Sequence, residues 1–109
     1  MGKFAIGDVV LIDFPYSDLT TFKKRPALVI GMAEFDNVIL CQITSSPFSS
    51  KIAIRVEIND LHTGTLPVTS YIRPDKIFTA DTSIVYKRLA TLSLVKYKDV
   101  KKALMHIFN

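Results

Sequence analysis

The chain has little of the chemistry on which most enzymes depend. Its 109 residues contain one cysteine, two histidines and four glycines. The lone Cys41 excludes an intrachain disulfide and, with no long apolar leader at the start of the chain, favours a reducing cytoplasm. His62 and His106 are too far apart in the sequence to suggest a metal site, and the scattered glycines exclude a glycine-rich phosphate loop. We therefore expect neither a metal nor another cofactor.

Long hydrophobic runs are also absent. A membrane-spanning helix needs about 18 or more consecutive apolar residues, and the sequence has no such run. Yet 49% of the residues are hydrophobic and the mean hydropathy is +0.28, which is apolar for a small domain with much surface per volume. The length fits a single domain over residues 1–109. The excess apolar surface predicts the interface of a homodimer.

Short β-branched apolar stretches, separated by proline and turn residues, predict a mainly β fold. The run at 8–14 predicts a largely buried strand that ends at Pro15. Residues 15–24 predict a long loop, and Pro26 is expected to begin the next strand because a proline does not fit the middle of a sheet. Further strands are predicted where apolar runs recur, at 38–44, 52–58, 70–73 and 76–79.

The end of the chain predicts a helix over residues 94–108, with Ser93 as its N-cap. Apolar residues three or four apart form one stripe along this helix: Leu94, Tyr97, Val100, Leu104 and Ile107. Such a stripe packs against a sheet. The predicted architecture is therefore a small β-barrel, or a strongly bent sheet, with a C-terminal helix packed on it.

Positive charge is concentrated in two places, within a net charge of +4. Residues 87–109 hold six basic residues and one acidic residue, which we interpret as a solvated face or a surface for an acidic protein partner. The second cluster, 23–25, ends in Arg25, whose guanidinium can grip phosphate oxygens with two hydrogen bonds. A run of hydroxyls at 44–46 can donate to the same oxygens. Alternatively, Arg25 forms an ion pair at the surface and the hydroxyls cap a turn.

The order and spacing of five segments resemble the MazF/PemK family of toxins, in its PemK-like branch. Residues 7–14 (Gly-Asp-Val-Val-Leu-Ile-Asp-Phe) and 24–30 (Lys-Arg-Pro-Ala-Leu-Val-Ile) resemble its N-terminal signature. The segment 41–46 is similar to the strand that carries the family's active-site threonine. Residues 70–77 and 89–93 resemble a later segment of the family and the start of its last helix.

The resemblance implies an SH3-like or CcdB-like barrel that forms a homodimer and cleaves single-stranded RNA without a metal. It also implies an antitoxin whose disordered acidic tail covers the RNA groove, with operator DNA bound only through the toxin–antitoxin complex. By position, Arg25 would be the principal catalytic residue and Thr44 its partner. The ribose 2′-OH would attack the adjacent phosphate, leaving a 2′,3′-cyclic phosphate and a 5′-OH.

Five further residues are candidates for binding the substrate: Tyr16, Lys23, Lys24, Ser45 and Ser46. Tyr16 would stack on a base, or instead pack on the barrel rim, and the lysines would contact phosphates. Three other functions remain open at this point. They are a CcdB-like toxin that poisons gyrase without cutting RNA, a barrel that binds nucleic acid without cleaving it, and a structural protein whose basic helix docks on an acidic chain.

Overall fold

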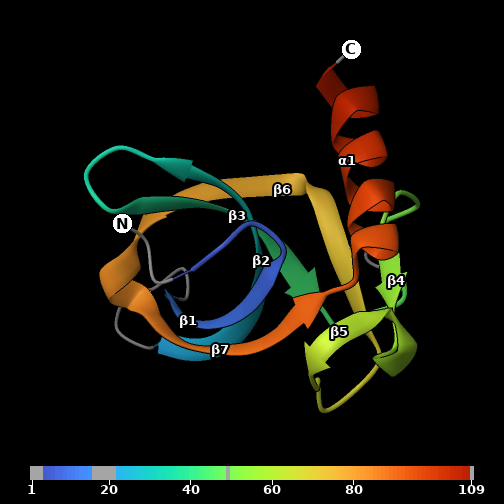
Figure 1. Cartoon of the computed structure of the whole chain (residues 1–109), viewed down its shortest axis with the longest axis horizontal. Helices are drawn as coiled ribbons and strands as arrows, with labels where there is room; N and C mark the ends of the chain where they lie inside the picture. Colours follow the sequence, from blue (N-terminus) through green and yellow to red (C-terminus); the bar gives the residue numbers. More distant parts are fainter. Residues whose placement is uncertain (1–3, 16–21, 49, 109) are drawn as a thin grey trace.

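A computed structural model of the chain describes residues 4–15, 22–48 and 50–108 (Figure 1). Within these residues, seven strands form one antiparallel sheet in the order β4-β6-β3-β2-β1-β7-β5, which curls into a small open barrel. The elements are β1 (Asp8–Pro15), β2 (Phe22–Ala33), β3 (Asn37–Thr44), β4 (Ile54–Val56), β5 (Leu61–Gly64), β6 (Ser70–Asp81), β7 (Val85–Leu92) and α1 (Leu94–Phe108), with 3-10 turns η1 (Ile58–Asp60) and η2 (Thr82–Ile84). The predicted mainly β fold with a C-terminal helix is confirmed.

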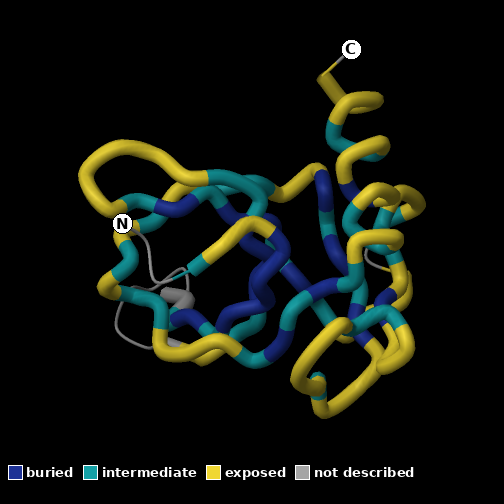
Figure 2. Tube along the Cα trace, viewed as in Figure 1, coloured by how far each residue is buried: buried dark blue, intermediate teal, exposed yellow. Residues whose placement is uncertain are grey.

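The middle of the central strands is buried on both faces, in agreement with the largely buried strand predicted at 8–14. Val9 lies in a core cluster with Leu28 and Cys41, whereas the next residue, Val10, lies in a second cluster with Ala27. Because successive side chains of a strand point to opposite faces, the part of a strand that lies between two cores is apolar at consecutive positions. Figure 2 shows this buried centre, with exposed segments at the turns and along α1.

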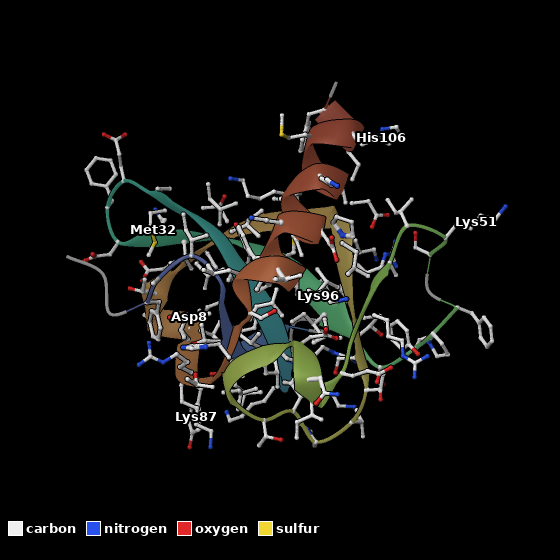
Figure 3. The ribbon with its side chains drawn as sticks, turned by 45° about the vertical axis from the view of Figure 1, so that its right-hand side comes forward. Asp8, Met32, Lys51, Lys87, Lys96 and His106 are labelled. Carbon is white, nitrogen blue, oxygen red and sulfur yellow. The ribbon has the colours of Figure 1, made fainter. Side chains whose placement is uncertain are left out.

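A buried carboxylate ties the start of β1 to its neighbours. Asp8 is 2% exposed and accepts hydrogen bonds from the Ala5 amide, the Thr91 hydroxyl and the Arg88 guanidinium at 2.8, 3.3 and 3.2 Å. Asp8 and Lys87 are labelled in Figure 3 on this side of the molecule. These bonds satisfy a charge that would otherwise be costly to bury, and they fix β7 against β1.

β2 begins earlier than the sequence predicted. It starts at Phe22, so residues 22–24 of the predicted loop 15–24, both lysines of the basic cluster included, lie in the strand. Pro26 also lies inside β2, and the expectation that it would begin a strand is wrong. The sheet tolerates this proline because pairing with β3 starts only at Ala27. Pro26 has no partner in β3, so the N–H group that proline lacks costs no hydrogen bond on that side.

β6 is one long strand where the sequence predicted two, at 70–73 and 76–79. The register with β3 jumps across residues 74–76, and this bulge lets a single strand turn the corner of the barrel. β4 keeps only three residues of the predicted strand 52–58 because the chain turns into η1 immediately after it. Both differences follow from the curvature of the sheet, which local sequence patterns do not specify.

The predicted helix is present, with Ser93 as its N-cap: the Ser93 hydroxyl accepts a 3.1 Å hydrogen bond from the amide three residues later. Three members of the predicted stripe pack against the core: Tyr97, Val100 and Leu104. The two ends of the stripe are wrong, because Leu94 is 82% exposed and Ile107 is 37% exposed. The last turns of α1 extend beyond the sheet (Figure 1). No helix in the described part of the chain is long and apolar enough to cross a membrane.

Candidate active site

The site forms where β2 and β3 stop pairing. Their ladder places Val29 opposite Leu40 and Ala27 opposite Gln42, and it ends there. Continuing this register by two residues would place Arg25 opposite Thr44. Opposite residues of an antiparallel pair share one face of the sheet. Arg25 and Thr44 therefore lie on the same face, at a point where the ladder between their strands has ended.

A pocket of about 430 Å³ opens at this point, and both residues line it. Lys23 and Lys24 join Arg25 on the β2 side, Ser45 continues from Thr44, and β7 adds a further cation. The opposite wall is the loop between β5 and β6, with Leu66, Pro67 and Val68. None of the described residues that line this pocket is a carboxylate or a histidine. Its polar groups are therefore cations and hydroxyls, which suit an anion such as a phosphate.

The Thr44 hydroxyl is held in place by the turn that follows it. Its oxygen accepts a 3.1 Å hydrogen bond from the Ser46 amide, which leaves the hydroxyl hydrogen for another acceptor. Ser45 lines the pocket, whereas Ser46 is exposed next to it and acts here through its backbone. The hydroxyl cluster thus has a structural role in shaping the turn as well as a place at the pocket.

Lys24 is engaged within the protein. It lies opposite Asp13 in the β1–β2 ladder, and its Nζ is 2.8 Å from the Asp13 carboxylate and 4.3 Å from the centre of the Tyr86 ring. The hydrogen bond that Lys24 donates to Asp13 raises the pKa of Lys24 above its ordinary value, so the ammonium stays charged. Lys23 is exposed and makes no ion pair within the described residues. Of the two lysines, Lys23 is the one whose charge is not engaged by an ion pair within the described residues.

Lys87 is a pocket residue that the sequence did not single out. It lies opposite Leu11 in the β1–β7 ladder, lines the pocket, and makes no ion pair in the part of the chain that the structure describes. Figure 3 shows it on the side of the molecule away from His106 on α1. In the sequence, Lys87 belongs to the basic stretch 87–109 that also includes the helix. Its place at the pocket follows from the pairing of β7 with β1, which the sequence did not predict.

Other candidate groups lie in structural roles. Arg73 donates two hydrogen bonds to Asp75, at 2.9 and 2.8 Å, and this pair lowers the pKa of the Asp75 carboxyl. Cys41 is buried, which raises the pKa of its thiol to about 12, so it stays protonated and unreactive. Across the described ranges, no group of three His, Cys, Asp or Glu side chains could hold a metal ion. Tyr16, the predicted stacking residue, lies outside the described residues.

Comparison with known proteins decides the family. The sequence matches the family described as "PemK-like, MazF-like toxin of type II toxin-antitoxin system" over residues 5–108. The chain belongs to this family. This match confirms the resemblance recognised in the five sequence segments. A search of curated proteins finds no match.

Solved structures of similar fold agree with the PemK-like assignment. A MazE–MazF complex from Deinococcus radiodurans has 20% identity and a TM-score of 0.77, and the match covers 99% of this chain and 97% of that one. An endoribonuclease in complex with its cognate antitoxin, from a mycobacterial species, has 17% identity and a TM-score of 0.75, over 99% and 95% of the chains. The Mycobacterium tuberculosis toxin MazF-mt6 has 16% identity and a TM-score of 0.72, over 93% and 95%. At these identities, the structures establish a common fold.

Proposed function

We propose that this PemK-like toxin is an endoribonuclease that cleaves single-stranded RNA at the pocket between β2 and β3, without a metal. The observation that carries the proposal is that Arg25 and Thr44 line one pocket whose other polar groups are cations and hydroxyls. The family assignment and the endoribonucleases among proteins of the same fold support it. They also favour cleavage of RNA over the CcdB-like poisoning of gyrase, for which this pocket would have no use.

In the proposed reaction, the ribose 2′ oxygen attacks the adjacent phosphorus in line. A new P–O2′ bond forms as the P–O5′ bond breaks, which leaves a 2′,3′-cyclic phosphate on one fragment and a 5′-OH on the other. The 2′-OH proton passes to solvent, and the departing 5′ oxygen takes a proton from solvent. Arg25 and the Thr44 hydroxyl donate hydrogen bonds to the non-bridging oxygens, where negative charge develops. Fixed donors in a pocket stabilise that charge without having to reorganise.

The first test is cleavage of a single-stranded RNA by the wild-type protein in the presence of EDTA. We expect cleavage at a similar rate with and without the chelator. The upstream fragment should carry a 2′,3′-cyclic phosphate, and the downstream fragment should be a substrate for polynucleotide kinase without prior phosphatase treatment. An intact RNA, or products with 5′-phosphate ends, would contradict the proposed reaction.

Lys87 is expected to contact a phosphate next to the scissile one. A cation that neutralises one phosphate of a single strand adds about 0.7 to the slope of log affinity against log salt. Lys87→Gln should therefore reduce the magnitude of this slope by about 0.7, measured by fluorescence anisotropy with a non-cleavable 2′-O-methyl RNA. Lys98→Gln, at an exposed position of α1, is the matched control and should leave the slope unchanged. Equal slopes for wild type and Lys87→Gln would exclude the contact.

The partners follow from charge and apolar surface. An antitoxin with an acidic, disordered tail would bind the same cationic pocket and compete with RNA, and antitoxin complexes are known for proteins of this fold.

A homodimer would cover apolar surface left exposed, including a hollow of about 330 Å³ beside α1 lined by Ile6, Ile30 and Leu104. Operator DNA would be bound only through the antitoxin complex. The proposed location is the cytoplasm, where the RNA substrate is found.

A further inference from the structure

A second hollow lies directly behind the wall of the active-site pocket. β4 and β5 are the two edge strands of the sheet, and the short turn η1 connects them, so the curled sheet brings its two edges together (Figure 1). A cavity of about 230 Å³ opens at this junction. Leu66, Pro67 and Val68 line both this cavity and the pocket that holds Arg25. The loop between β5 and β6 is therefore a thin partition between the two hollows.

The lining of this second cavity suits a flat, largely apolar group with hydrogen-bond donors. Val56, Leu61 and the partition loop provide apolar surface, and Ile58 and Val68 at the cavity are 68% and 55% exposed. Among the described residues that line it, Glu57 is the one that carries a charge. A carboxylate repels phosphate and accepts hydrogen bonds from N–H groups. The cavity is also smaller than the about 300 Å³ or more that a drug-sized ligand needs.

Resting on the proposed ribonuclease function, we propose that this cavity is a nucleobase subsite, in which Glu57 selects a base that carries an exocyclic amino group. RNA-binding proteins read single strands by turning out bases, packing them on side chains and bonding their edges. A nucleotide beside the scissile phosphate would reach over the partition loop, with its phosphates on the cationic side and its base on the apolar side. The phosphates of the RNA would thus lie against cations, and the base would lie against apolar side chains.

The geometry of Glu57 specifies what it can accept. Its Oε2 is 2.7 Å from Nε of Arg55, and its side chain also accepts from the Asp60 amide in the capping box of η1. These two contacts orient the carboxylate, and because a carboxylate has about four lone-pair sites, it can still accept a hydrogen bond from a ligand. Adenine, cytosine and guanine each carry an amino donor, whereas uracil presents carbonyl acceptors at the equivalent positions. The one donor on the Watson–Crick edge of uracil is N3–H, which lies between two carbonyl oxygens, so a carboxylate that accepts from it also meets a carbonyl oxygen. The subsite therefore discriminates against uracil at one position beside the cleaved bond.

The test uses a pool of single-stranded RNA with random bases around a cleavage site, and sequencing of the 5′ ends of the products. For wild type, uracil should be at least about tenfold depleted at one position, as expected for one hydrogen bond to a charged group. Glu57→Gln should remove this depletion, because an amide can also donate to the uracil carbonyl. Preferences at the other positions should not change. Glu34→Gln, in the exposed turn after β2, should behave as wild type.

The outcomes separate this proposal from the function on which it depends. If wild type leaves the pool intact, the proposed ribonuclease function fails. If wild type cleaves but Glu57→Gln and wild type give the same base profile, the function stands and the subsite is excluded. Glu57 is exposed and lies outside the core, so Glu57→Gln should keep the wild-type melting temperature. A changed profile in the folded variant then reports on recognition of the base.

Discussion

Arg25→Ala should cleave single-stranded RNA about 10²- to 10³-fold more slowly than wild type in single-turnover experiments with enzyme in excess. One preorganised donor to a developing oxyanion is worth about 3–4 kcal/mol, which corresponds to this factor. The loss should appear in the rate of the chemical step more than in RNA affinity, because the variant keeps Lys23 and Lys87 in the pocket, where we propose that they contact neighbouring phosphates. Rapid-quench kinetics and anisotropy with non-cleavable RNA measure the two quantities separately.

Arg25→Lys is the informative companion to this variant. It keeps a positive charge in the pocket but loses the planar pair of donors that fits two phosphate oxygens. We expect it to bind RNA like wild type and to recover only part of the rate. A folded Arg25→Ala protein, judged by its circular dichroism spectrum and melting temperature, that cleaves within about threefold of wild type would remove Arg25 from the reaction.

Gly64→Ala should strongly destabilise the fold. Gly64 has φ +77°, in the left-handed region, and an added Cβ would overlap the Leu89 carbonyl oxygen and lie 2.6 Å from the Ala90 Cα. These contacts are backbone atoms of β7, which cannot move aside as a flexible side chain can. Strain and overpacking together should lower the free energy of unfolding by about 3–5 kcal/mol.

Thermal unfolding followed by circular dichroism measures this effect. For a chain of this length, each kcal/mol corresponds to about 4–8 °C, so the melting temperature should fall by at least about 12 °C. Gly7→Ala is the matched control, since Gly7 also has a positive φ, of +98°, but an added Cβ would meet no atom within 4 Å. It should cost only about 1–2 kcal/mol. Equal melting temperatures for the two variants would refute the close β5–β7 contact.

This contact matters for function because it fixes the partition loop. β5 ends at Gly64, the Thr65 amide donates to the Leu89 carbonyl, and the loop with Leu66 and Val68 follows at once. The position of one wall of the pocket thus depends on how closely β5 packs against β7, with which it pairs. Gly64 is therefore a structural residue that the close β5–β7 contact requires, and its replacement would also disturb the site.

The sequence predicted those parts of the molecule that local patterns encode. The apolar run of β1 predicted a largely buried strand, Ser93 predicted the start of α1, and the segments around Arg25 and Thr44 predicted the family. Arg25 and Thr44 lie on neighbouring strands of one hairpin, so their meeting at one pocket depends on short-range pairing.

The parts that the sequence did not predict depend on contacts between distant segments. Lys87 reaches the pocket because β7 pairs with β1, and the partition loop reaches it because the curled sheet brings its edges together. The role of Lys24 as an ion-pair partner of Asp13 required the register of two strands. The exposed ends of the apolar stripe on α1 reflect how far the sheet extends beneath the helix. No local pattern specifies these features.

The central claim is that Arg25 and Thr44 act on the same phosphate, and a double-mutant cycle tests it most directly. Arg25→Ala, Thr44→Val and the double variant are compared with wild type in single-turnover cleavage of one RNA. Groups that stabilise one transition state as a unit are not additive. We predict that the double variant loses much less than the product of the two single losses. A double variant that loses the full product would contradict a shared role for the two residues.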